Sequence, residues 1–134
     1  MDAITLVEGA IHNPAEPRHF MEFRWSERRC VATLDGHELA RSARTLKLCE
    51  VGRHVYDPVL YFPLDDVHLE SLKVTDKTTH CPLKGDTCYY DYIDDGGAIR
   101  AADVAWRYVK PFDFAAVLAD YIAFDPARVE IREL

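Results

Sequence analysis

Apolar and polar residues alternate along much of the chain. In "FMEFRW" (residues 20–25), the apolar side chains from Met21 to Trp25 alternate with charged ones, a period of two that is typical of a half-buried β-strand. The alternation continues in "TLKLCE" (45–50). The apolar run "PVLYFP" (58–63) is bounded by prolines, which cannot donate to a strand ladder and therefore mark its ends.

Turn residues join these runs into hairpins. Asp35-Gly36 lies in the middle of "CVATLDGHELARS" (30–42), and Asp-Gly readily adopts the positive φ angles of a tight hairpin turn. "DDGG" (94–97) separates two further alternating runs, which predicts a second hairpin. The closing segment "ARVEIREL" (127–134) has the pattern of one more strand.

Helical patterning is confined to "DFAAVLADYIA" (113–123), where Asp113 is predicted to be the N-cap. No internal repeat or low-complexity linker divides the sequence. We therefore predict a mainly β protein: a single compact domain, residues 1–134, of antiparallel sheets built from about seven short strands, with one or two short helices.

Composition excludes several classes of function. Hydrophobic residues make up 49% and charged residues 29%, an ordinary globular mixture. A formal charge of −7 disfavours nucleic-acid binding, which depends on clustered Lys and Arg. "DAITLVEGAI" lacks the features of a signal peptide, and no apolar run is long enough to cross a bilayer. We expect a soluble, cytoplasmic protein without nucleic-acid or membrane partners; its oligomeric state is not determined by these features.

Four cysteines are present: Cys30, Cys49, Cys81 and Cys88. In the cytoplasm they would be reduced thiols. They form no Cys-x-x-Cys pair of the kind found in zinc sites and dithiol redox centres. We therefore expect mostly buried, structural thiols.

The segment "TTHCPLKGDTCYYDY" (78–92) carries the densest chemistry, and three interpretations are open. His80, Cys81 and Cys88 could bind zinc with another cysteine, although neighbouring strand residues point to opposite faces. Alternatively, Lys84 could lower the thiol pKa of Cys81 and make it a nucleophile. The simplest alternative is a turn in which Cys81 packs inward and Lys84 is solvated. We predict neither a metal nor a cofactor.

Three charged residues outside this segment are also candidates. Arg44 and Glu50 lie at even spacing near the ends of a predicted strand, so both side chains could project to one face. Asp66 follows the apolar run 58–63 and either caps a turn or faces a pocket.

Five segments in order resemble one known family. They are "ELARSARTLKLCE", "VLYFPLDDV", "TTHCPLKGDTCYY", "VAWRYVKP" and "IAFDPARVEI". Together they resemble the domain of unknown function numbered 427, sometimes labelled nucleotidyltransferase-like. The resemblance extends over about residues 19–132, and its most specific element is Thr-x-Cys-Pro-x-Lys-Gly at residues 79–85.

The resemblance implies a β-tent-like domain in which antiparallel sheets meet at an angle over one core. Related zinc-binding domains carry paired Cys-x-x-Cys motifs that are missing here. The carboxylate pair of a nucleotidyltransferase is also missing. The family pattern falls on Arg44, Glu50, Tyr61, Pro63, Asp66, Thr79, Cys81, Lys84, Gly85, Tyr89 and Trp106. These matches favour a cluster of polar side chains in a pocket between the sheets.

Three functions follow as hypotheses. In the first, which we favour, the protein binds a small polar or anionic ligand through Arg44, Glu50, Tyr61, Thr79, Cys81, Lys84, Tyr89 and Trp106. In the second, it is an enzyme that uses Cys81, Glu50 or Asp66 with Lys84 stabilising negative charge. In the third, it is a protein-interaction domain. The identity of a ligand is not encoded in any of these patterns.

Overall fold

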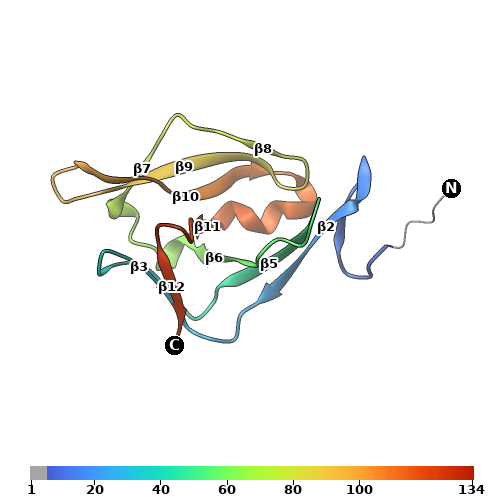
Figure 1. Ribbon diagram of the computed structural model, residues 1–134, viewed down its shortest axis with the longest axis horizontal. Coiled ribbons are helices and arrows are strands. Elements are labelled where there is room, and N and C mark those ends of the chain that lie inside the picture. Colours follow the sequence, from blue (N-terminus) through green and yellow to red (C-terminus); the bar gives the residue numbers. More distant parts are fainter. Residues whose placement is uncertain (1–5) are drawn as a thin grey trace.

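A computed structural model describes residues 6–134 (Figure 1). This part of the chain forms a mainly β domain of twelve strands and three 3₁₀ segments. The strands are β1 (Ile11–Asn13), β2 (Glu16–Trp25), β3 (Cys30–Leu34), β4 (His37–Ser42), β5 (Leu46–Val51), β6 (Val59–Pro63), β7 (Leu72–Val74), β8 (His80–Cys81), β9 (Gly85–Ile93), β10 (Ile99–Pro111), β11 (Tyr121–Phe124) and β12 (Glu130–Glu133). The 3₁₀ segments are η1 (Leu64–Asp66), η2 (Leu69–Ser71) and η3 (Asp113–Asp120).

The strands of the described residues pair antiparallel in two sheets. The larger has nine strands in the order β1-β2-β5-β6-β11-β10-β9-β7, with β8 pairing to β9. The smaller has three strands in the order β12-β3-β4. The prediction of a single, mainly antiparallel β domain is confirmed. The expected number of strands was too low, because several short strands at the sheet edges carry no clear alternation.

Side chains on the two faces of the larger sheet form separate hydrophobic clusters. On β6 the neighbours Tyr61 and Phe62 are both fully buried but belong to different clusters, because successive strand residues point to opposite faces. Phe62 packs against Phe124 with ring centroids 5.5 Å apart and faces the three-stranded sheet, whose Ala32 and Leu39 lie in the same cluster. Burying each large apolar side chain contributes about 1.5–3 kcal/mol.

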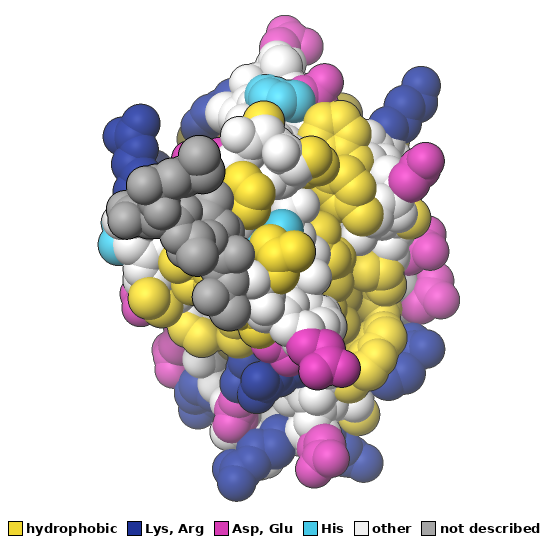
Figure 2. Space-filling model, turned by 90° about the vertical axis from the view of Figure 1, so that its right-hand side faces the viewer, with side chains coloured by type: hydrophobic (Ala, Val, Ile, Leu, Met, Phe, Trp, Pro, Cys, Tyr) yellow, Lys and Arg dark blue, Asp and Glu magenta, His cyan; other side chains and the backbone are white. Residues whose placement is uncertain are grey.

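The second cluster packs beneath η3. Leu118 of η3 is fully buried against Met21 of β2 and Leu46 of β5. In Figure 1, η3 lies between the β9–β10 ribbon and strands β2 and β5. Its opposite side leaves Phe114 and Val117 exposed. Hydrophobic side chains also gather on the face of the molecule that Figure 2 shows.

Both predicted hairpins are confirmed. β3 and β4 pair antiparallel across Asp35 and Gly36, whose φ angles are 49° and 80°, the left-handed conformation that this turn requires. At the second turn, the Asp94 side chain accepts hydrogen bonds from the backbone amides of Gly96 and Ala98 at 3.0 and 2.9 Å. The Asp94 carboxylate therefore serves the geometry of this turn.

Three local predictions are wrong. Asp113 is the first residue of η3 and not its N-cap, a position that Phe112 occupies without any side-chain cap. The predicted helix also ends early: Tyr121–Phe124 form β11, in the middle of the larger sheet, because pairing on both sides outweighs a short helical pattern. Trp25 is 62% exposed at the end of its strand, although its alternation places it with the buried side chains.

Within residues 6–134, no helix is both long and apolar enough to span a bilayer.

Candidate functional site

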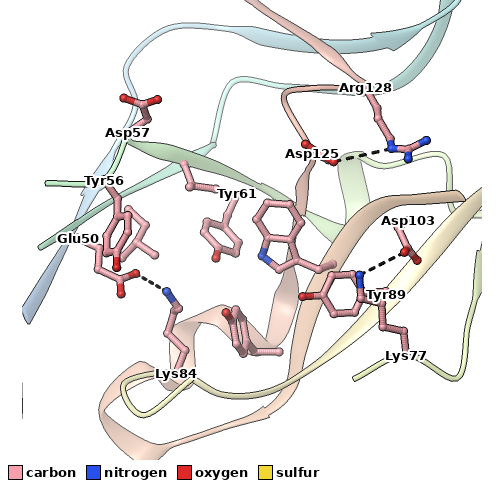
Figure 3. A pocket seen from close by; sticks show the side chains of 14 residues that line it. Glu50, Tyr56, Asp57, Tyr61, Lys77, Lys84, Tyr89, Asp103, Asp125 and Arg128 are labelled. Carbon is pink, nitrogen blue, oxygen red and sulfur yellow. Dashed lines mark hydrogen bonds and ion pairs between the residues drawn. The ribbon is translucent and has the colours of Figure 1, made fainter. Parts of the chain in front are cut away.

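A cavity of about 520 Å³ lies on the η3-side face of the larger sheet. Aromatic and charged side chains form its wall (Figure 3). The lining residues are Leu48, Glu50, Tyr56, Asp57, Val59, Tyr61, Lys77, Lys84, Tyr89, Asp103, Trp106, Tyr108, Asp125 and Arg128. The lining strands β5, β6, β9 and β10 all belong to the nine-stranded sheet. The cavity is therefore an open hollow formed by the bending of one sheet. The prediction of a pocket between two sheets is wrong.

The bend brings together two charges that are distant in the sheet. Glu50 lies on β5 and Lys84 just before β9, with β6, β11 and β10 between these strands in the sheet order. Nevertheless, the Lys84 ammonium donates a hydrogen bond of 2.5 Å to Glu50 Oε1. The side chains are only 8% and 15% exposed, respectively, so the two charges are held in a poorly solvated site.

The turn between β8 and β9 directs Lys84 inward. Its backbone amide donates to the Cys81 carbonyl at 3.3 Å, closing the turn. Gly85 follows at φ 111°, and a Cβ there would come within 3.1 Å of the Lys110 carbonyl oxygen. Only glycine fits this conformation and this close approach to β10. The Phe112 amide then donates to the Lys84 carbonyl at 3.1 Å, so that the end of β10 holds the turn in place.

Glu50 has a second partner in His19 of β2. The distance between His19 Nε2 and Glu50 Oε2 is 2.7 Å, and the imidazole is itself 16% exposed. Burial acts to raise the pKa of Glu50, but the charge of Lys84 and its hydrogen bond, with the hydrogen bond from His19, outweigh it and hold the pKa below its usual value. Glu50 is therefore a carboxylate at neutral pH, and each of its two oxygens accepts a hydrogen bond.

Tyrosines supply neutral polar groups to the wall. Burial raises the pKa of both Tyr61 and Tyr108, so their hydroxyls stay protonated and can donate or accept hydrogen bonds. The Lys84 ammonium lies 5.7 Å from the centroid of the Tyr108 ring. The Tyr89 hydroxyl is 2.8 Å from Thr79 Oγ1, which is 2.7 Å from Thr87 Oγ1. Thr79 therefore positions Tyr89.

Two further ion pairs contribute to the lining. Lys77 Nζ lies 3.2 Å from Asp103 Oδ2, and Arg128 Nε lies 3.9 Å from Asp125 Oδ2. Figure 3 shows Tyr61 between these pairs and the Glu50–Lys84 pair. Each cation that lines the cavity thus already has a carboxylate partner.

A family model described as "Domain of unknown function (DUF427)" matches residues 22–133. This match spans most of the chain and agrees with the sequence resemblance. The chain belongs to the DUF427 family. No match to a curated protein was found.

The structure brings together five of the DUF427 pattern residues at the cavity: Glu50, Tyr61, Lys84, Tyr89 and Trp106. Burial of Lys84 shows that the solvated-lysine alternative is wrong. Thr79 does not line the cavity, but its hydroxyl is hydrogen-bonded to that of Tyr89.

Arg44 and Asp66 lie elsewhere, so the prediction that they share a pocket with Lys84 is wrong. Arg44 is 64% exposed, and its Nη2 lies 3.4 Å from Asp66 Oδ2. Asp66 also accepts a hydrogen bond of 2.6 Å from Ser42. The physical reason is that β5 begins only at Leu46; the alternation that would have aligned Arg44 with Glu50 does not extend back to it.

Cys81 is half-buried and lines a neighbouring depression with His19 and His80, on the other side of Glu50. It packs against the cluster beneath η3. All four cysteines are free thiols, of which only Cys30 is fully buried. Across residues 6–134, no three His, Cys, Asp or Glu side chains gather as metal ligands would.

Sequence reasoning missed much of this DUF427 site. The missed residues are His19, Tyr56, Asp57, Lys77, Asp103, Tyr108, Asp125 and Arg128. A partial signal existed for one group: "FDPAR" contains an Asp-Pro turn beside an arginine, directly after the apolar run that became β11. The others come from loops and from strands β2 and β10, and their meeting in space depends on the whole sheet.

Proposed function

We propose that this DUF427 protein binds a small polar ligand in the cavity bounded by β5, β6, β9 and β10. The observation that carries the proposal is a cavity of about 520 Å³ in which aromatic rings surround the buried Glu50–Lys84 pair. Binding sites for small molecules combine aromatic walls with convergent polar groups, and this cavity is lined by five aromatic and seven charged side chains.

The buried ion pair supports a role in binding rather than in stability. Taking two charges out of water costs several kcal/mol per ion, so that an apolar pair of similar volume is often as stable. An ammonium has three donors, and Glu50 occupies one of those of Lys84. A polar ligand in the cavity could accept from another, and the tyrosine hydroxyls offer further partners.

NMR titration against a library of small polar metabolites and nucleotides tests this proposal. The chain has two tryptophans: Trp106 lines the cavity, whereas Trp25 is 62% exposed on β2. A ligand of the cavity should shift the Trp106 indole N–H resonance and leave that of Trp25 unchanged.

Variants of the two tryptophans give matched controls. Trp106→Phe should weaken binding of any such ligand, and Trp25→Phe should not. A library in which no compound shifts Trp106, or in which hits also bind Trp106→Phe with full affinity, would exclude the proposal.

A second candidate function, catalysis by acid and base, rests on the contacts of Glu50. His19 and Lys84 contact its two oxygens at 2.7 and 2.5 Å, an arrangement in which a carboxylate, an imidazole and an ammonium can exchange a proton with a bound substrate. If a ligand of the cavity is converted, Glu50→Gln should abolish turnover while binding persists. Turnover that survives this substitution would exclude Glu50 as the catalytic group.

We also infer that the domain has the β-tent arrangement and works in the cytoplasm. The angle between its two sheets, compared with that in solved β-tent domains, tests the first point. Four free thiols, three of them partly exposed, suit a reducing compartment. Localisation of the tagged full chain in its source cells tests the second.

A further inference from the structure

We propose that the ligand of this cavity is a cation, an organic ammonium whose charge lies against the Tyr89 ring and beside Asp103. This inference rests on the proposed binding function and adds the chemical class of the ligand. A lysine and an arginine in a cavity would usually suggest an anionic ligand. Here each lining cation already has a carboxylate partner, which argues against an anion.

Lys77 shows how the wall accommodates an ammonium. Its Nζ lies over the Tyr89 ring, 4.4 Å from the centroid, and 3.2 Å from Asp103 Oδ2. An aromatic face and a carboxylate together are the recognition elements for an ammonium group. The Lys77 side chain reaches them from the segment between β7 and β8 and is 49% exposed, so a long flexible side chain holds this position at the rim.

The position of Asp103 is fixed by its backbone. Asp103 has φ 53°, a left-handed conformation that few non-glycine residues adopt and that often marks functional positions. Its amide donates to Asp91 Oδ1 at 2.9 Å, inside an irregular part of the β9–β10 pairing. The wall therefore presents this carboxylate from the backbone of β10, whereas the competing ammonium of Lys77 is carried on a long side chain that is 49% exposed.

The charges of the lining favour a cation. Four carboxylates (Glu50, Asp57, Asp103 and Asp125) line the cavity against three cations (Lys77, Lys84 and Arg128), which leaves one negative charge in excess. Each of the three cations has a carboxylate within 4.0 Å. Among the described residues Asp57 has no ion-pair partner, so at the exposed rim it adds a negative charge that no cation offsets.

Choline and 3,3-dimethyl-1-butanol form a matched pair of probes, since they share their shape and differ in charge. In NMR titrations at constant ionic strength, choline should shift the Trp106 indole resonance with an affinity at least about fivefold above that of the neutral alcohol. Acetate and inorganic phosphate should not shift it. Equal affinity for choline and the alcohol, tighter binding of either anion, or the absence of any choline shift overturns the inference.

The direction in which substitution of Lys77 changes the affinity for choline gives the sharpest test. Lys77→Met removes the internal competitor and should strengthen choline binding about two- to fivefold; an anionic ligand would instead bind more weakly. Lys73→Met removes the same charge from exposed β7, outside the cavity lining, and should change nothing. Weaker choline binding by Lys77→Met overturns the inference.

A substitution of the carboxylate should act in the opposite direction. Asp103→Asn removes its charge with a residue that tolerates the left-handed conformation, and should weaken choline binding. Asp95→Asn, in the exposed β9–β10 turn, is the control for net charge. If Asp103→Asn binds choline as well as Asp95→Asn does, the inference is wrong.

The metabolite library separates this inference from the proposed function. A neutral or anionic hit would leave the binding function standing, whereas a library without hits would remove both.

Discussion

Two ion pairs of this protein each join a basic to an acidic side chain, but in different surroundings. Lys84 and Glu50 meet at 2.5 Å with side chains 8% and 15% exposed, whereas Arg44 and Asp66 meet at 3.4 Å with side chains 64% and 27% exposed. Water screens the second pair and has little access to the first. The comparison shows that matching a residue to a family pattern does not assign its role; burial does.

Breaking the inner pair should have the largest effect. Lys84→Met leaves the Glu50 carboxylate buried with His19 as its remaining neighbour, and should lower the free energy of unfolding by about 3 kcal/mol. Denaturant titration measures this loss. Adding Glu50→Leu should recover most of it, because two apolar side chains replace two charges. A single variant as stable as the parent would show that the pair is solvated.

Acid should weaken the same pair. The pKa of Glu50 is lower in the folded protein than in the unfolded chain, so its contribution to stability is complete above the unfolded value of about 4.3 and is lost as the pH falls through the folded value. The free energy of unfolding should therefore decrease as the pH is lowered through this range, and it should decrease less steeply in Glu50→Gln.

Glu38→Gln is the matched control for the pH experiment. Glu38 also has a lowered pKa, through its hydrogen bond to Arg41, but this pair is on the surface. Its substitution should change the pH slope less than Glu50→Gln does. An equal change of slope in the two variants would contradict a special role for the buried carboxylate.

The outer pair should give the smallest effect. Arg44→Ala removes an exposed partner of Asp66, and surface ion pairs contribute about 0–1 kcal/mol. Asp66 keeps its hydrogen bond from Ser42, so its carboxylate is not left unsatisfied. Denaturant titration at low and high salt measures the loss, which should shrink as salt is added. A loss comparable with that of Lys84→Met would erase the distinction between the pairs.

The difference between the pairs also explains what the sequence can predict. Asp35-Gly36 specifies its turn through local backbone preferences, so the hairpin was predictable. Five residues of the cavity were recognised through the family pattern. Lys77 and Asp103 were not, because their meeting depends on a loop and on an irregular register within β10. For Lys84 the local turn and Gly85 direct the side chain inward, but its burial beside Glu50 depends on the bend of the whole sheet, as does the exposure of Arg44.

The contact between Gly85 and the end of β10 has a consequence for biosynthesis. The turn that carries Lys84 is secured by Lys110 and Phe112, which leave the ribosome well after Glu50 and Lys84 themselves. A nascent chain that stops short of these positions has both charges but no scaffold to join them. The cavity is therefore completed late in translation, once the C-terminal third of the polypeptide has been made.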